Sequence, residues 1–310
     1  MTGSAAQQPA DDALIGIYGA LPRIRSVAIS PNGAHVAFIQ RVEGHDTFVV
    51  IDQRSGEVIG AANASEVKAR SVYFATPNHV ILIASRTLSH VRIRGDWEHH
   101  NAVVYDIRTG DLTRLPRKQM NLFVGQSGLG RLIGVDSENA RVYLPAFFEA
   151  GREPSNHLME IDLDDGDARI HEEGNAHTVD WFVGRGGRVL AREDFVNKKH
   201  LHIVYSYASG EPVELYRSET EIPDLRIEGV SDDESALVVV AKVGAADAVH
   251  RISLADGSWS EPAHVQSDGE IDSVVTFPPE RFAHGIRVSG PLPSYLLFDE
   301  VDNRIMAGLQ

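Results

Sequence analysis

The stretch FVVIDQRSGEVI, residues 48–59, decides the fold of this chain, because its pattern returns along the whole sequence. An apolar run at residues 49–51 is followed by a polar turn at 52–56 and a second short run at 57–59. Asp52 can accept the backbone N–H groups of the turn, and Gly56 supplies the positive φ that a type I turn with a bulge requires. The stretch therefore predicts two antiparallel strands joined by a tight turn.

The same hairpin pattern occurs five more times, at residues 103–112, 158–167, 203–213, 250–259 and 295–305. The late turn residue is glycine in the first five copies and asparagine in the sixth: Gly56, Gly110, Gly166, Gly210, Gly257 and Asn303. Another turn precedes each hairpin, and in four of the six copies its first residue lies 26 positions before that glycine or asparagine. Repeats of roughly 46 to 60 residues with four short strands are typical of propeller blades. We therefore predict an all-β protein, a β-propeller with about six four-stranded blades.

The repeats also predict the domain organisation. We expect a disordered segment at residues 1–12 and one propeller domain at 13–310, with blades near residues 24–62, 68–116, 130–172, 178–217, 224–263 and 270–308. The sequence ends shortly after the sixth copy. It is either a six-bladed ring closed by its N-terminal segment or a seven- or eight-bladed propeller cut short, and we favour the second. An open ring would expose apolar blade faces.

Composition narrows the class of partner. Lys and Arg number 29 against 44 Asp and Glu, a net charge of −15, which argues against binding to nucleic acid. Without cysteine the chain has no disulfide, thiolate metal site or cysteine nucleophile.

No apolar run approaches the roughly 18 residues of a membrane span. The run AAQQPA at residues 5–10 is typical of the mature N-terminus left after a secretory signal is removed. We therefore expect a periplasmic or secreted protein, with the cytoplasm as the alternative.

The largest insertion lies in the second repeat, at residues 85–101, SRTLSHVRIRGDWEHHN. We expect it to be a loop between the second and third strands of that blade. Three interpretations remain. We favour a solvated loop whose Trp97 packs on the blade. The loop could instead be a contact surface for a partner domain or peptide, since Trp and Arg are common anchors, or a metal site at residues 98–100. Adjacent loop residues lack the i, i+4 spacing of a helical zinc site. We accordingly predict no metal and no cofactor.

Two further extensions, at residues 117–130 and 147–156, fall at the same end of the strands as this insertion, because alternate connections of an antiparallel blade share one end. Loops held by a rigid scaffold commonly carry binding residues, so we predict a functional face over blades 2 and 3. The binding or interface candidates are Arg92, Arg94, Trp97, His99, His100, Glu149 and Arg152. Four other histidines show no metal-ligand spacing and are expected at the surface: His171, His177, His200 and His202.

The N-terminal part resembles a known family. Residues 17–40, IYGALPRIRSVAISPNGAHVAFIQ, followed by VVIDQRSGEV, are similar to the start of the β-propeller of prolyl-oligopeptidase-family serine peptidases, particularly the acylaminoacyl-peptidase and dipeptidyl-peptidase-like bacterial branch. The Leu-Pro, Ser-Pro-Asn-Gly and Asp-x-x-Ser-Gly elements carry the resemblance. It implies a propeller, usually of seven or eight blades, that caps a C-terminal α/β-hydrolase domain and restricts entry of large substrates.

The sequence departs from that family in its chemistry. A hydrolase of this kind needs a G-x-S-x-G nucleophile elbow followed by Asp and His, and the nearest strings, GQSGL at 125–129 and GSWS at 257–260, do not fit. We therefore assign no catalytic residue to this chain. Three functions remain: a domain that gates and orients peptide substrate for a separate α/β-hydrolase domain, which we prefer; a free-standing scaffold that binds a protein or peptide; and a propeller enzyme with a central metal or acid pair.

Overall fold

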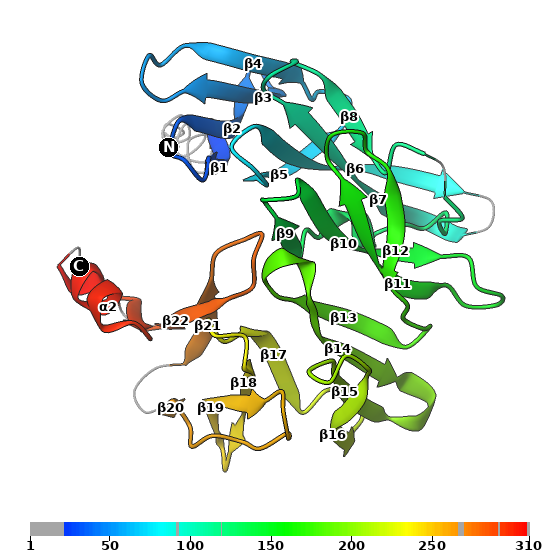
Figure 1. The fold of residues 1–310 in the computed structure, drawn as a ribbon, viewed down its shortest axis with the longest axis vertical. Coiled ribbons are helices and arrows are strands. Elements are labelled where there is room, and N and C mark those ends of the chain that lie inside the picture. Colours follow the sequence, from blue (N-terminus) through cyan, green and yellow to red (C-terminus); the bar gives the residue numbers. More distant parts are fainter. Residues whose placement is uncertain (1–21, 91–92, 119, 266–269, 291, 309–310) are drawn as a thin grey trace, which may run out of the picture.

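The computed structural model describes residues 22–90, 93–118, 120–265, 270–290 and 292–308. In these residues the chain forms six antiparallel sheets in chain order, five of four strands and one of three. The sheets lie side by side around a common axis, with the first and sixth sheets at the two ends of an incomplete ring (Figure 1). We call them blades 1 to 6. The number of sheets agrees with the number of blades expected from the repeats.

The strands of each blade pair in sequence order. Blades 1 to 3 comprise β1 (Ile24–Ile29), β2 (His35–Val42), β3 (His45–Asp52) and β4 (Val58–Asn63); β5 (Lys68–Phe74), β6 (His79–His90), β7 (Ile93–Asp106) and β8 (Leu112–Leu115); and β9 (Gly134–Asp136), β10 (Arg141–Phe148), β11 (Ser155–Asp162) and β12 (Ala168–Glu172). Blades 4 to 6 comprise β13 (Thr178–Val183), β14 (Val189–Val196), β15 (Leu201–Ser206) and β16 (Val213–Glu219); β17 (Leu225–Val230), β18 (Ala236–Val243), β19 (Ala246–Ser253) and β20 (His264–Val265); and β21 (Ile271–Thr276), β22 (Ala283–Val288) and β23 (Ser294–Leu297).

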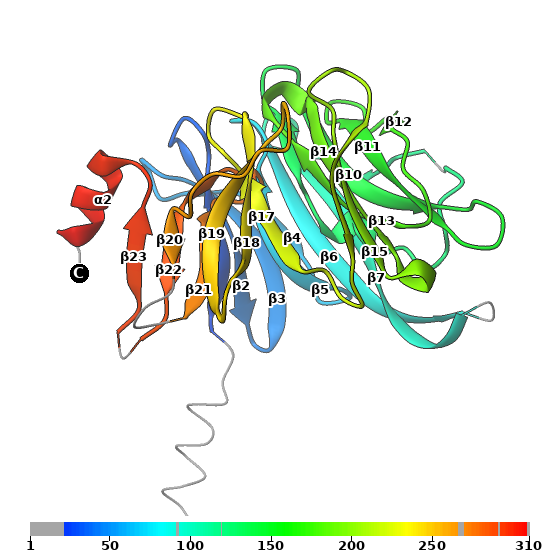
Figure 2. The same ribbon diagram turned by 90° about the horizontal axis from the view of Figure 1, so that it is seen from below.

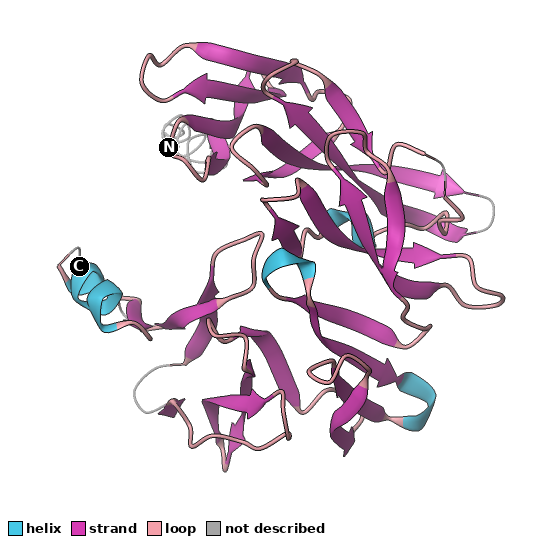
Figure 3. Cartoon of the chain, viewed as in Figure 1, coloured by secondary structure: helices cyan, strands magenta, loops and turns pink. Residues whose placement is uncertain are grey.

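Helical structure is confined to short pieces in the described part of the chain (Figure 3). Three 3₁₀ turns, η1 (Gly128–Gly130), η2 (Arg185–Gly187) and η3 (Asn197–Lys199), lie in connections, and the helix α2 (Glu300–Ala307) follows β23. The helix corrects the sixth predicted hairpin. Asp299 accepts hydrogen bonds from the backbone N–H groups of Val301 and Asp302, which makes it an N-cap. Asn303 consequently lies within a helix, and no strand follows β23 in the described residues.

The turn chemistry behind the repeat prediction is confirmed. The five hairpin glycines, from Gly56 to Gly257, have φ values between 73° and 90°. In the first hairpin, the Asp52 carboxylate accepts the backbone N–H groups of Arg54 and Ser55 at 3.0 and 2.7 Å. A residue with a Cβ is strained at such φ values, so the glycine spacing marks where each hairpin turns.

The core lies between successive blades rather than in one central mass. Five clusters of buried apolar side chains occur in the described ranges, one at each interface between consecutive blades. The largest of them joins blades 2 and 3 and includes Ile83, Leu115 and Leu144, all at most 1% exposed. Each blade thus buries its faces against its neighbours, as radial repeats require. At the open end, β1 leaves Val27 and Ile29 about 60% exposed, as expected of a blade that packs on a described neighbour, blade 2, on one side only.

The insertion at residues 85–101 is not the loop expected from the sequence. It lengthens β6 and β7 to 12 and 14 residues, and the pairing continues from Ser85 with His100 to Ser89 with Asp96. Figure 2 shows this hairpin projecting from the side of the molecule. The extension forms because polar and apolar residues alternate through Thr87, Leu88 and Ser89, which suits a strand with one solvated face.

No helix in the described residues is long and apolar enough to cross a membrane.

Candidate functional site

The connection between β8 and β9 lies across blades 2 and 3 and touches both. On the blade 2 side, the backbone N–H of His100 donates to the carbonyl of Gln126 at 3.1 Å. On the blade 3 side, the Phe123 N–H donates to the Phe147 carbonyl at 2.9 Å, and the Glu149 N–H donates to the Asn121 carbonyl at 3.0 Å. The connection therefore has strand-like backbone pairing to the end of β10 and is not a free loop.

Gln126 is the side chain that holds this connection in place. It is 1% exposed, and its amide donates to the Phe147 carbonyl at 2.9 Å. Its side-chain oxygen accepts the N–H groups of Phe147 and Gly128, each at 3.1 Å. A buried amide with this set of partners orders the backbone around it, because an unmet polar group would be costly there.

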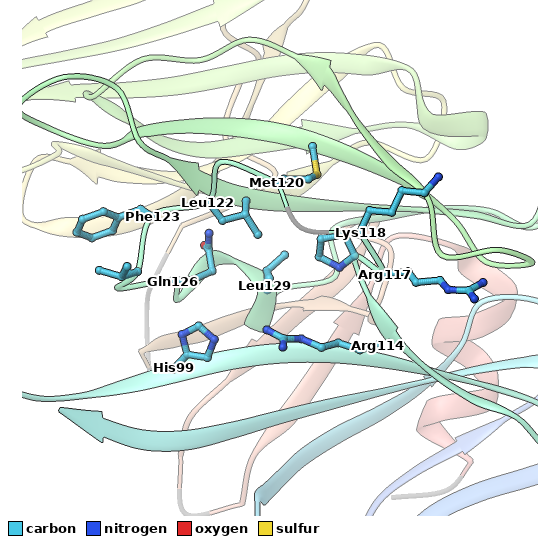
Figure 4. A pocket seen from close by; sticks show the side chains of 11 residues that line it. His99, Arg114, Arg117, Lys118, Met120, Leu122, Phe123, Gln126 and Leu129 are labelled. Atoms are coloured by element: carbon cyan, nitrogen blue, oxygen red, sulfur yellow. The ribbon is translucent and has the colours of Figure 1, made fainter. Parts of the chain in front are cut away.

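A cavity of about 380 Å³ lies between this connection and the outer strands of blade 2. Figure 4 shows its side chains: His99 of β7 and Arg114 of β8 lie along one side, with Leu129 beside them and Met120 and Leu122 opposite. Leu129 is 2% exposed. The cavity therefore combines an apolar wall with the basic side chains of His99 and Arg114, and Arg117 and Lys118 also border it.

The basic residues around the cavity differ in their partners. Lys118 forms an ion pair with Asp167 of blade 3, and Arg117 donates to the Asp165 carbonyl at 3.5 Å. Both side chains point away from the cavity in Figure 4. Burial lowers the pKa of His99, and the positive charge of Arg114 lowers it further. At neutral pH the imidazole is therefore neutral, and Arg114 supplies the cavity's positive charge.

The predicted site residues do not all converge on this cavity. His99 lines it, whereas Trp97 is half-buried on the outer part of β7. His100 packs against the connection: a Cβ on Gly130 would lie 2.6 Å from His100 Cδ2. Its ring is thus a packing surface that requires glycine opposite it.

The other predicted residues lie at the ends of strands. Glu149 follows β10 and is half-buried, and Arg152 is exposed in the turn between β10 and β11. Arg94 belongs to β7, but its side chain is not described, and Arg92 lies outside the described residues. The three extensions thus gather around blades 2 and 3, but only His99 among the predicted residues reaches the cavity in the described part of the chain.

Glu98 anchors the outer hairpin to the first strand of blade 2. Its carboxylate accepts hydrogen bonds from Ser85 at 2.6 Å, Lys68 at 3.0 Å and Arg70 at 2.9 Å. The Ser85 hydrogen bond and then that of Lys68 are the main causes that lower the pKa of Glu98 to about 2. A metal ion at residues 98–100 would have to displace the two cations that already pair with this carboxylate. Across the described ranges, no group of three or more His, Asp or Glu side chains is placed to hold a metal ion.

Sequence reasoning missed Arg114 and Gln126. Arg114 sits in an ordinary strand, and nothing in its neighbours distinguishes it from other exposed arginines. Gln126 belongs to the long connection, in which no residue type stands out from the rest. Two surface predictions were also wrong: His202 is fully buried and His171 is partly buried, whereas His177 and His200 are exposed.

No protein-family profile matches the chain, and no curated protein matches its sequence. Solved structures do match its fold. Acylaminoacyl peptidase from Pyrococcus horikoshii is 13% identical with a TM-score of 0.51, over 94% of this chain and 47% of that one. This chain thus spans about half the length of that peptidase.

Two other structures give comparable matches. The β-propeller domain of the Trilobed protease from Pyrococcus furiosus is 12% identical with a TM-score of 0.50, over 93% of this chain and 84% of that one. An oligogalacturonate lyase, solved in complex with manganese, is 11% identical with a TM-score of 0.54, over 86% of this chain and 70% of that one. At such low identity these likenesses show the fold alone: the chain is a β-propeller.

Proposed function

We propose that this chain is the non-catalytic β-propeller domain of a prolyl-oligopeptidase-like serine peptidase, gating and orienting peptide substrate for a separate α/β-hydrolase domain. The observation that carries the proposal is the ordered face over blades 2 and 3, where the long β6–β7 hairpin and the β8–β9 connection meet. Two of the propellers that share the fold belong to peptidases, and the N-terminal motifs resemble the same family. Its setting would be the periplasm or the outside of the cell.

The proposal is tested first on the gene. Reading beyond the codon for Gln310, or in the neighbouring genes, should reveal a G-x-S-x-G elbow with a later Asp and His. The hydrolase so identified should copurify with the propeller. If no such hydrolase is encoded and none copurifies, the proposal fails. The alternative is then a free-standing propeller scaffold for a protein or peptide, which the same face would serve.

The substrate-orienting role predicts a selective kinetic effect. In the hydrolase-containing protein, Arg152→Ala should change kcat/KM for a peptide of about ten residues by threefold or more, because this exposed side chain belongs to one of the three extensions that we propose to form the substrate-orienting face. A dipeptide substrate should react unchanged, since it would not reach that face. Arg217→Ala, an exposed arginine of blade 4, serves as the control. Equal effects of Arg152→Ala on both substrates would contradict the orienting role.

A further inference from the structure

The cavity beside His99 contains a cation without a counter-ion, in a protein whose net charge is −15. Arg114 donates no hydrogen bond and forms no ion pair within the described ranges, although most arginines there, such as Arg108 and Arg131, pair with carboxylates. The Nδ1 atom of His99 is buried and has no hydrogen-bond partner among the same residues. Two polar groups on one wall thus have unused hydrogen-bonding capacity.

The opposite wall is apolar. Met120 and Leu122 of the connection face Arg114 across the cavity, and Leu129 closes its inner side (Figure 4). The Gln126 amide also borders the cavity, but its hydrogen bonds to Phe147 and Gly128 are already made. A ligand that satisfies both walls must therefore carry an acceptor group at one end and an apolar group at the other.

The charge of the cavity distinguishes among anions. A guanidinium matches the geometry of a carboxylate through two parallel N–H donors, so Arg114 by itself can pair with a carboxylate in this cavity. A phosphate dianion would require a second cation, but Lys118 is paired with Asp167, Arg117 donates to the Asp165 carbonyl, and both side chains are directed outward. One guanidinium therefore favours a monoanion. A volume of about 380 Å³ suits a ligand of one or two amino-acid residues.

We propose that this cavity binds the C-terminal carboxylate of a peptide whose last side chain is apolar. The carboxylate pairs with Arg114 beside His99, and the side chain packs on Met120, Leu122 and Leu129. The cavity is lined by His99 of β7 and Arg114 of β8. These are the third and fourth strands of blade 2, so the cavity lies at the outer part of that blade. This inference goes beyond the proposed function, because it requires no hydrolase domain.

Calorimetric titration of the chain with N-acetyl-leucine and with N-acetyl-leucinamide tests the proposal. The two probes share the apolar side chain and differ in the carboxylate, so the acid should bind at least tenfold more tightly than the amide. Arg114→Gln should weaken binding of the acid by at least tenfold and leave binding of the amide unchanged. Arg108→Gln is the matched control, because Arg108 is exposed on the same blade and pairs with Asp106.

Specific outcomes would overturn the proposal. They are equal affinity for acid and amide, no detectable binding of the acid, an unchanged affinity in Arg114→Gln, or tighter binding of phenyl phosphate than of N-acetyl-leucine. Should Arg114→Gln not fold, Arg114→Lys keeps the charge but loses the paired donors, and it should still weaken binding of the acid. The absence of a hydrolase would defeat the proposed function but not this result, so the two can fail separately.

Discussion

His202 shows how a single residue can depend on its blade neighbours. Its ring is fully buried, Nε2 lies 2.8 Å from Glu193 Oε1, and Nδ1 lies 3.5 Å from Asp224 Oδ1. Burial alone would lower the pKa of His202, but the hydrogen bonds and charges of Glu193 and Asp224 outweigh it, and the pKa is raised. Asp224 is held by the hydroxyls of Tyr216 and Ser218, each at 2.7 Å. The protonated imidazole is thus the form that the fold favours.

This arrangement predicts a pH-dependent stability. Because the folded-state pKa lies above the ordinary value of 6.5, the stabilisation by His202 is complete below that value and is lost as the pH rises through the folded-state pKa. Urea denaturation near pH 5.5 should show His202→Gln to be about 2 kcal/mol less stable than wild type. The difference should shrink near pH 8.5. His177→Gln, at an exposed position, should show no such trend. A difference that is constant or grows with pH would contradict the assignment.

At the scale of the element, the β6–β7 hairpin is the feature that departs from the repeat. Its outer part projects from the side of the molecule (Figure 2), so its order depends on local contacts. Glu98 provides them by joining the hairpin to Lys68 and Arg70 of β5. The same residue lies one position before His99, so the anchored hairpin also fixes the wall of the cavity.

Removing the Glu98 charge should loosen the outer hairpin without unfolding the blade. In Glu98→Gln, amide hydrogen exchange at residues 86–89 and 96–98 should accelerate, by less than about tenfold. Residues 80–84 should keep their protection, because their side chains lie in the buried core. In the wild type the same loosening should occur only as the pH falls from 4.5 toward the folded-state pKa of about 2. Glu66→Gln, an exposed glutamate before β5, is the control. Uniform acceleration across blade 2 would indicate a global effect instead.

The whole molecule is held by packing between neighbours and by a polar link that crosses several blades. Asp180 of β13 accepts hydrogen bonds from Arg131, before blade 3, at 2.8 and 3.0 Å. It also accepts one from Arg281 of blade 6 at 2.7 Å, and the Arg281 guanidinium lies 4.3 Å above the Phe182 ring centroid. This cluster joins residues about 100 positions apart in the chain, which contacts between consecutive blades alone would not do.

Neutralising this link should lower the stability of the assembled blades. Asp180→Asn should reduce the free energy of unfolding by about 2 kcal/mol, because two guanidinium groups lose their shared carboxylate. Asp272→Asn removes a more exposed partner, that of Arg287. It should lower the free energy of unfolding by less than about 1 kcal/mol. Chemical denaturation of both variants makes the comparison. If Asp180→Asn lowers the free energy of unfolding by no more than Asp272→Asn does, the Asp180 cluster contributes no more to stability than an exposed ion pair.

The features that the sequence alone determined are local in origin. The hairpin glycines require positive φ wherever they occur, and apolar alternation has a period of two, so turn spacing and strand pattern predicted an all-β propeller with six sheets. The prediction failed in two places where local signals compete. Asp299 caps a helix where a sixth hairpin turn was predicted. Residues 85–101, predicted to be a loop, continue two strands because polar and apolar residues alternate there. Only the tertiary structure decided which distant side chains meet. The placement of His99 beside Arg114, the burial of His202 and the Asp180 cluster depend on how strands and blades stack, and no local pattern encodes that geometry.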